Sequence, residues 1–278
     1  MKVLAIIGSP RKGHSYQVTQ QIERRLKQNG DVRFEYVFLS QMNLQACRGC
    51  YVCQSLGEQY CPLEDDRADL VKRMRQADGT IFVSPAYTGN VSGLMKNLMD
   101  RLAYTAHRPA FLGKPAMLVA TASSYTKDTL KALAWFGYAG FEIVSRLGLP
   151  VWPSTRRAWR GGESVDRKFD KAVKRFENAL SCRPVSLPLR KVLQFYLMKA
   201  SAATDPAFFE ADYDYHKDLS HLNFRVSWWK RLLGSLCCWI VVKWVNRHLV
   251  SINQGNSPKK GDASDKAKTK LPEGNSTQ

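Results

Sequence analysis

Short apolar runs alternate with longer amphipathic stretches over the first two thirds of the chain. A run of β-branched and aliphatic residues at 3–7 ends at Gly8, which predicts a strand followed by a turn. Comparable apolar or alternating runs rich in strand-forming residues recur further along the chain. They predict strands at 32–39, 80–83, 116–121 and within 142–151.

Helical periodicity fills the intervals between these runs. Apolar residues spaced three and four apart predict helices at 15–28, 66–76, 92–103, 126–140 and 163–181. Because strand alternates with helix, the pattern predicts a doubly wound α/β domain, whose five-stranded parallel sheet is covered by helices on both faces.

The pattern changes after Cys182. Residues 183–250 mix aromatic residues with helical runs, and residues 251–278 almost lack large apolar side chains. A segment so poor in apolar groups cannot bury a core, so we expect it to be disordered. The sequence therefore predicts a domain at 1–182, a helical, aromatic-rich extension at 183–250 and a disordered tail.

Charge adds a constraint on partners. The 278 residues carry a formal net charge of +18, with a pI near 9.7. Such an excess of cations suits an anionic cofactor, an anionic membrane surface or nucleic acid. No helix-turn-helix, zinc-finger or RRM signature accompanies the charge, so we expect no nucleic-acid partner.

The amino terminus bears on the compartment. The stretch MKVLAIIGSPRKG is apolar for only a few residues and has no cleavage-site pattern, which predicts a buried strand rather than a signal peptide. We therefore expect a cytoplasmic, reducing environment, in which disulfides explain the cysteines poorly.

The stretch GSPRKGHS connects the first strand to the first helix. In an open parallel sheet, ligands bind at the carboxyl ends of the strands. A helix N-terminus at that edge offers unpaired N–H groups and a positive dipole end to a phosphate. The motif is neither GxGxxG nor GxxxxGK[ST], and an ordinary basic turn is the alternative interpretation. The hydroxyl, cationic and backbone donors expected at a phosphate are Ser9, Arg11, Lys12, Gly13, His14 and Ser15.

A second loop, SPAYTGNVSG, follows the third strand. Gly89 allows close approach of the backbone, and Tyr87 could stack on a flat ring. Asn90 and Ser92 could hydrogen-bond the edges of such a ring, and Ser92 could cap the next helix. Taken alone, Tyr87 is equally consistent with a surface aromatic residue.

Four stretches occur in a familiar order: GSPRKGHS, CRGCYVC, ADGTIFVSPAYTGNVSGLMKNLMDR and PAMLVAT. Over residues 1–180 the chain therefore resembles the NADPH-dependent FMN reductase family, which includes the iron–sulfur flavoproteins and has a flavodoxin-like fold. The resemblance implies FMN held between three loops, with NAD(P)H as co-substrate. It assigns the phosphate to the first loop, the isoalloxazine ring to the second and the ring or ribityl side to the third. The implied cofactor-binding residues are Ser9, Arg11, Lys12, Gly13, His14, Ser15, Tyr16, Pro85, Ala86, Tyr87, Thr88, Gly89, Asn90, Val91, Thr121, Ser123 and Ser124.

The third loop departs from the family pattern. It reads TASSYT, whereas family members often carry glycines there. The bulkier Ser123, Ser124 and Tyr125 should limit how freely a nicotinamide or substrate stacks on the flavin. We assign no catalytic side chain, because hydride transfer is the chemistry of the cofactor and the protein supplies orientation and electrostatics.

Four of the seven cysteines lie close together, in the pattern C-x2-C-x2-C-x7-C. Zinc sites usually combine two separated CxxC pairs, whereas three cysteines at successive x2 spacing are more typical of a four-iron cluster. The iron–sulfur flavoproteins carry a compact motif of this kind, so the resemblance implies a 4Fe-4S cluster on Cys47, Cys50, Cys53 and Cys61. The long last gap makes Cys61 the weakest of the four assignments. A structural loop with buried thiols is the other interpretation.

The remaining candidates have simpler interpretations. Cys182, Cys237 and Cys238 lack partners at ligand spacing and should be packing residues. Asp65 and Asp66 follow the cysteine motif and should cap the next helix rather than carry out acid–base chemistry.

The extension contains an unusual stretch at 227–249, SWWKRLLGSLCCWIVVKWVNRHL. Its apolar centre is too short to span a bilayer and contains Lys243. One interpretation is an interfacial helix in peripheral contact with a membrane, since tryptophans and cations suit a headgroup layer. The other is a helix packed on the flavin domain or across a dimer. The residues that should share one broad helical face are Trp229, Leu232, Leu233, Leu236, Ile240 and Trp244.

These features together predict an FMN-dependent NAD(P)H oxidoreductase that passes electrons, directly or through a cluster, to a small-molecule or protein acceptor. The alternative is a non-enzymatic, flavodoxin-like electron carrier that docks on partner proteins. A third hypothesis is a basic membrane-surface protein without redox chemistry. The resemblance also implies a homo-oligomer.

Overall fold

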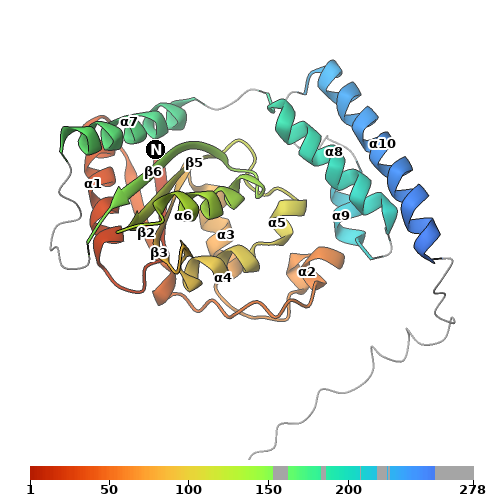
Figure 1. Cartoon of the computed structure of the whole chain (residues 1–278), viewed down its shortest axis with the longest axis horizontal. Coiled ribbons are helices and arrows are strands. Elements are labelled where there is room, and N and C mark those ends of the chain that lie inside the picture. Colours follow the sequence, from red (N-terminus) through yellow and green to blue (C-terminus); the bar gives the residue numbers. More distant parts are fainter. Residues whose placement is uncertain (153–161, 183–185, 207, 218–223, 225, 254–278) are drawn as a thin grey trace, which may run out of the picture.

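Five parallel strands form the centre of the molecule (Figure 1). The computed structural model describes residues 1–152, 162–182, 186–206, 208–217, 224 and 226–253. The strand order is β2-β1-β3-β5-β6, the doubly wound order of flavodoxin-like folds, so the predicted fold class is confirmed. A short strand, β4 (Asn90–Val91), pairs antiparallel with the end of β3. The parallel strands are β1 (Lys2–Ile7), β2 (Arg33–Phe38), β3 (Gly79–Tyr87), β5 (Pro115–Ala122) and β6 (Glu142–Pro150).

Helices cover both faces of this sheet. On one face α1 (His14–Gln28) and α7 (Glu163–Ser181) bury a core with the alternate side chains of the strands. On the other face the covering elements are α3 (Arg67–Gln76), α4 (Gly93–Arg101), α6 (Thr126–Leu133) and the 3-10 turn η3 (Ala134–Gly137). Strands buried on both faces explain the continuous apolar runs of the sequence. The shorter elements are η1 (Leu39–Gln41), α2 (Val52–Ser55), η2 (Glu58–Tyr60) and α5 (Tyr104–His107).

Two element boundaries differ from the sequence-based expectation. The third strand was expected to close at Ser84 and Pro85, but β3 continues to Tyr87, because Ser84 and Pro85 keep their pairing with β5 and β4 adds a second partner. The helix expected at 126–140 ends at Leu133 and gives way to the 3-10 turn.

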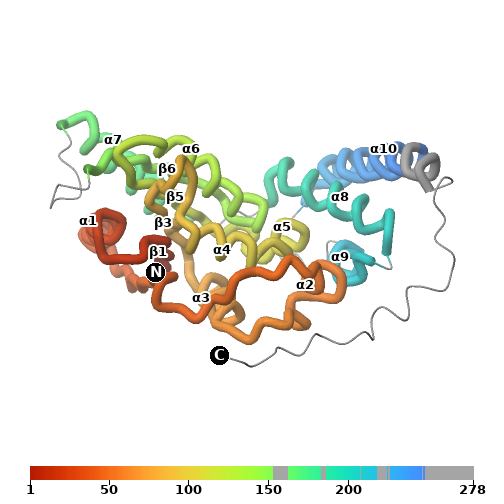
Figure 2. The backbone as a smooth tube through the Cα atoms, turned by 60° about the horizontal axis from the view of Figure 1, so that its bottom comes forward, coloured from red at the N-terminus to blue at the C-terminus, as the bar shows by residue number. Residues whose placement is uncertain are grey.

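The described part of the carboxyl-terminal extension contains three helices: α8 (Leu189–Thr204), α9 (Glu210–Tyr215) and α10 (Trp228–Asn253). Helices α8 and α10 lie side by side, and α9 lies between α8 and the region of α2 (Figures 1 and 2). Helix α10 continues through 251–253, where the sequence predicted the tail to begin, and the tail from 254 onward lies outside the described residues. Among the helices described, none combines the length and apolarity that crossing a membrane requires.

Candidate functional site: a loop cavity and a cysteine cavity

Loops that follow three neighbouring strands enclose a cavity of about 780 Å³, here called the loop cavity. The carboxyl ends of β1, β3 and β5 meet at one edge of the sheet, which brings these loops together. The lining consists mainly of small, hydroxyl-bearing and backbone-exposing residues: Ser9, Arg11, Gly13, His14, Ser15, Gln17, Pro85, Ala86, Tyr87, Thr88, Gly89, Thr121, Ala122, Ser123, Ser124, Tyr125 and Val151.

The first loop leads directly into α1. The buried Ser9 hydroxyl donates to the Arg11 carbonyl at 2.8 Å, which folds the loop back on itself. Gly13 occupies the N-cap and supplies no capping side chain. The first turn of α1 therefore lines the cavity with backbone N–H groups and a positive dipole end, beside the exposed Arg11. This arrangement fits a phosphate.

The second loop is a two-residue hairpin between β3 and β4. Tyr87 pairs with Asn90, and the two residues between them, Thr88 and Gly89, have positive φ of 51° and 73°. Positive φ at both central positions is the type I′ geometry that matches the twist of a hairpin. The tight turn brings the backbone of the hairpin to the cavity, with Tyr87 at 43% exposure on its rim.

The third loop follows β5 and is tied to the first. The hydroxyls of Thr121 and Ser15 share a buried hydrogen bond of 2.8 Å. Tyr125 has φ of 62°, remains 62% exposed and approaches the hairpin, since a Cβ placed on Gly89 would lie 3.9 Å from its ring. The bulky Tyr125 side chain expected in the third loop therefore lies next to the tip of the hairpin.

A second cavity of about 420 Å³, here called the cysteine cavity, is lined by all four thiols of the cysteine motif. Gly49 and Tyr51 have positive φ of 65° and 59°, which turns the short loop around the cavity. Cys47 and Cys50 are exposed, which disagrees with the interpretation of the motif as buried packing thiols. Within the described part of the chain, no three Cys, His, Asp or Glu side chains converge closely enough to hold one metal ion.

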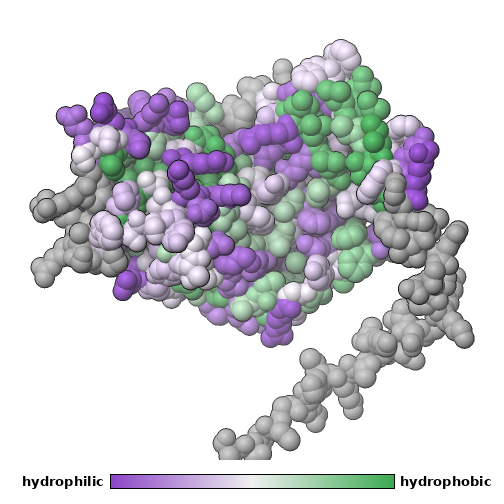
Figure 3. Space-filling view, in the orientation of Figure 1, coloured by the Kyte–Doolittle hydropathy of each residue, from purple (hydrophilic) through white to green (hydrophobic). Residues whose placement is uncertain are grey.

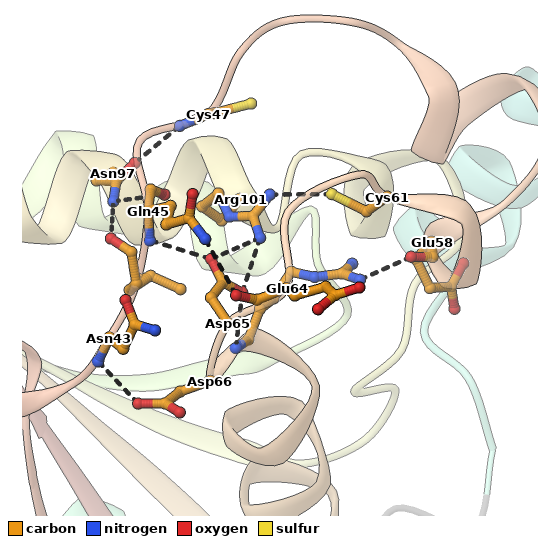
Figure 4. Close-up of polar contacts among 12 residues, drawn as sticks. Asn43, Gln45, Cys47, Glu58, Cys61, Glu64, Asp65, Asp66, Asn97 and Arg101 are labelled. Atoms are coloured by element: carbon orange, nitrogen blue, oxygen red, sulfur yellow. Dashed lines mark hydrogen bonds and ion pairs between the residues drawn. The ribbon is translucent and has the colours of Figure 1, made fainter.

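A buried ion pair supports the wall of the cysteine cavity (Figure 4). Both oxygens of Asp65 accept from Arg101 at 2.8 Å, with side-chain exposures of 1% and 3%. Arg101 also donates to Cys61 Sγ at 3.1 Å, and Asp65 accepts from the Gln45 backbone N–H. Burial alone would raise the pKa of the Cys61 thiol, but the hydrogen bonds from the Leu63 backbone and Arg101 outweigh it and lower that pKa.

Cys53 and two arginine side chains also line the cysteine cavity. Burial, followed by repulsion from the neighbouring thiols, raises the pKa of the Cys53 thiol. Arg67 and Arg101 both line the cavity, and the buried Nε of each has no hydrogen-bond partner among the described residues. Unpaired buried donors of positive charge beside four thiols fit an anionic group held by the cysteines.

A model of the family described as NADPH-dependent FMN reductase matches residues 1–146. The chain belongs to this family. The matched residues contain the whole cysteine cavity and all of the loop cavity except Val151.

Relatives within the FMN reductase family include proteins named iron-sulfur flavoproteins. One from Methanocaldococcus jannaschii is 38% identical over 102 residues, which cover 36% of this chain and 51% of the relative. Another from Archaeoglobus fulgidus is 30% identical over 193 residues, which cover 64% of this chain and 96% of the relative. For several curated relatives, the matched region spans only about half of their length. The crystal structure of an NADH:FMN oxidoreductase in its apo form is similar with 18% identity and a TM-score of 0.48, covering 66% of this chain and 91% of that one.

Most residues assigned to FMN by resemblance to the reductase family line the loop cavity, but four of them do not. Lys12 lies over the rings of Phe38 and Tyr16, with its Nζ 5.2 and 5.9 Å from their centroids. Tyr16 packs in turn against Tyr36 and Phe38. Asn90 and the buried Val91 belong to β4, behind the hairpin tip.

Other side chains differ from their expected contacts. Ser92 caps α4 as predicted, accepting from the Met95 N–H, but it is buried and donates to the Gly8 carbonyl rather than lining the loop cavity. The cavity residues that the sequence analysis missed are Gln17 and Val151, whereas Ala122 and Tyr125 belong to the third loop, 121–125, which it assigned to the ring or ribityl side. Val151 follows β6, and its place at the same sheet edge was the signal that could have found it.

The two acidic residues after the cysteine motif act differently from each other. Asp65 accepts from the Arg67 N–H at 3.1 Å, so it caps the start of α3 as expected. Asp66 occupies the N-cap position without capping, because its carboxylate accepts from the Asn43 N–H. Cys182 was expected to be a packing residue and is instead exposed beyond the end of α7.

The acidic, aromatic segment of the extension is joined to the cysteine loop, which the sequence did not reveal. Asp212 of α9 is buried and accepts from Arg108 and from His107, the latter at 2.7 Å. Arg108 also donates to the Cys53 carbonyl and forms an ion pair of 3.1 Å with Glu58. Through Arg108, helix α9 therefore stabilises the loop that carries the cysteines.

Proposed function

We propose that this chain is an FMN-dependent oxidoreductase that takes electrons from NADH or NADPH and passes them to a small-molecule or protein acceptor through a 4Fe-4S cluster. The observation that carries the proposal is that α4 connects the two cavities. Its N-cap, Ser92, fixes the start of the helix to Gly8 beside the loop cavity, and Arg101 at its carboxyl end lines the cysteine cavity. A helix of nine residues extends roughly 14 Å, so the two sites are close neighbours.

The loop cavity offers each part of FMN a matching surface. The first turn of α1 and Arg11 would bind the phosphate, the Pro85–Gly89 backbone would face the ring, and Thr121 would line the ribityl side. When bound, FMN accepts a hydride from a reduced nicotinamide and releases electrons one at a time. The protein's part is to orient the ring and to exclude water beneath it.

The cysteine cavity would hold the cluster through Cys47, Cys50, Cys53 and Cys61, a group that relays single electrons when bound. Arg67 would balance part of its negative charge, and Arg101 would hold Cys61 in place through its hydrogen bond to Sγ. Asn97 of α4 holds the entry to this loop, since its amide donates to Leu44 O and accepts from the Cys47 N–H.

Titration of the purified chain with FMN tests the flavin half of the proposal. We expect quenching of flavin fluorescence with a stoichiometry of one, followed by oxidation of NADH or NADPH when ferricyanide or a quinone is added. A chain that takes up no FMN would overturn the proposal.

A flavodoxin-like electron carrier is the second candidate function. Tyr125 favours it, because this exposed ring lies beside the hairpin tip, where a nicotinamide would approach the flavin. A carrier would bind FMN and accept electrons from a reduced protein or dithionite, but would not oxidise either nicotinamide at saturating FMN. If Tyr125→Gly restores nicotinamide oxidation, the Tyr125 side chain is what keeps the nicotinamide away from the flavin.

A further inference from the structure

Helix α10 exposes a broad apolar surface, here called the α10 outer face. Its members are between 42% and 75% exposed: Trp228, Trp229, Leu232, Leu233, Leu236, Trp239, Ile240 and Trp244. The space-filling view shows a continuous hydrophobic area where Figure 1 places the carboxyl-terminal helices (Figure 3). Monomeric proteins rarely expose an apolar area of this extent without a partner for it.

The opposite side of α10 is fixed against α8, so the helix cannot simply turn its outer face inward. Gly234 lies so close to α8 that a Cβ on it would come within 2.1 Å of the Tyr196 ring. At the start of the helix, Lys230 donates to the Leu187 carbonyl at 2.7 Å and Arg231 to the Val226 carbonyl at 3.2 Å. Packing and hydrogen bonds therefore set the rotation that leaves the outer face exposed.

The charged residues of α10 have one sign. The helix contains four Lys or Arg residues and no Asp or Glu. Lys243 lies over the Trp239 ring, with its Nζ 4.5 Å from the centroid, and Arg247 is exposed one turn further along. Apolar and cationic groups are thus interleaved on the same exposed side of α10.

We propose that the α10 outer face binds the headgroup layer of an anionic lipid bilayer, with the helix lying in the plane of the surface. Tryptophan rings favour the boundary between hydrocarbon and headgroups, and lysine and arginine are attracted to anionic lipid. A second copy of the chain is the weaker occupant, because a symmetric contact would bring the cations of both copies together. The in-plane arrangement agrees with the finding that no described helix is apolar enough to cross the membrane.

Co-sedimentation of the full-length protein with lipid vesicles tests this proposal. We expect binding to vesicles of equal parts phosphatidylcholine and phosphatidylglycerol, with a shift of tryptophan emission to shorter wavelength. Binding to phosphatidylcholine alone should be much weaker, and added salt should weaken binding to the mixed vesicles.

Three variants resolve the contributions. Leu236→Ser with Trp239→Ser should abolish measurable binding. Lys243→Ala with Arg247→Ala should weaken binding to the mixed vesicles by about fivefold for each cation. Tyr213→Ser, which removes an aromatic side chain of similar exposure from α9, should bind as the wild type does. Circular dichroism and thermal unfolding of each variant confirm that the fold is retained.

Two results would overturn the proposal. One is wild-type protein that stays in the supernatant with both kinds of vesicle. The other is a wild-type protein that does not bind vesicles but forms a concentration-dependent dimer in sedimentation velocity. If the Leu236→Ser/Trp239→Ser variant abolishes that dimer, a second copy of the chain is the occupant of the α10 outer face.

Discussion

The loop cavity and the cysteine cavity are built by different means. The loop cavity depends on backbone: a helix N-terminus without a capping side chain, a tight hairpin and strands that end at one edge. The cysteine cavity depends on buried charged side chains, above all the Arg101–Asp65 and Arg108–Asp212 pairs. A single side-chain substitution should therefore have a small effect on the loop cavity and a large effect on the cysteine cavity.

The largest effect is expected from Asp65→Ala. Removing one partner of a buried ion pair leaves the other charge uncompensated, which costs about 3–5 kcal/mol of unfolding free energy. Arg101 would also lose the anchor that directs it to Cys61. Urea unfolding and iron content of the purified variant measure both consequences.

Asp170→Ala is the matched control. Asp170 forms an ion pair of 2.9 Å with Arg25, similar in length to the Asp65–Arg101 pair, but both side chains are about half exposed. It should change stability by only about 0.2–1 kcal/mol. Equal effects of the two substitutions would refute the difference drawn between the buried and the exposed pair.

Asp212→Ala tests whether the extension supports the cysteine loop. It leaves Arg108 without its buried carboxylate and releases α9, for an expected loss of about 3 kcal/mol. Hydrogen exchange should rise in α9 and in the cysteine loop, while FMN affinity stays unchanged. Faster exchange confined to α9 would show that the extension does not brace the loop.

A pH-dependent effect is expected where α8 meets the flavin domain. Burial lowers the pKa of Lys191 to about 8, whereas the unfolded chain titrates near 10.5. Between these values the unfolded state binds more protons, so the contribution of Lys191 to the unfolding free energy should rise as the pH increases. The wild type should gain about 2 kcal/mol relative to Lys191→Met across this window, measured by urea unfolding. Parallel pH profiles for the two proteins would argue against a buried, titrating lysine.

The smallest effect is expected in the loop cavity. Arg11→Ala should weaken FMN binding about tenfold, the size of one charge-assisted hydrogen bond, with iron content unchanged. Lys12→Ala is the control, because Lys12 lies over the Tyr16 and Phe38 rings and does not line the cavity. Fluorescence titration measures the FMN affinity of both variants. A larger loss of affinity in Lys12→Ala than in Arg11→Ala would show that Lys12, not Arg11, binds the phosphate.

The sequence was informative where local patterns determine the structure. The apolar runs and helical periods predicted the parallel sheet, and the GSPRKGHS stretch predicted a loop at its carboxyl edge because strand, turn and helix are contiguous there. The direction of neighbouring side chains was harder to predict. Lys12 and Arg11 differ by one position in a loop without regular periodicity, and only the packing of Phe38 shows which of them lies away from the cavity.

Long-range pairs could not be predicted from the sequence. Asp65 and Arg101 are 36 residues apart and Arg108 and Asp212 are 104 apart, so no local spacing connects them. The cysteine motif itself was visible, but Arg67 and Arg101, which line its cavity, come from α3 and α4 further along the chain. The apolar face of α10 was predicted, whereas its exposure follows from the close contact of Gly234 with α8.

Anaerobic purification followed by an absorption spectrum and assays of FMN and iron tests the central claim most directly, namely that the two cavities hold two redox groups. The account predicts one FMN and about four irons per chain, with flavin bands over a broad cluster absorbance. Iron should be lost in Cys53→Ser and retained in Cys182→Ser, whose thiol lies away from the cavity. Flavin without iron, after anaerobic reconstitution with iron and sulfide, would contradict it.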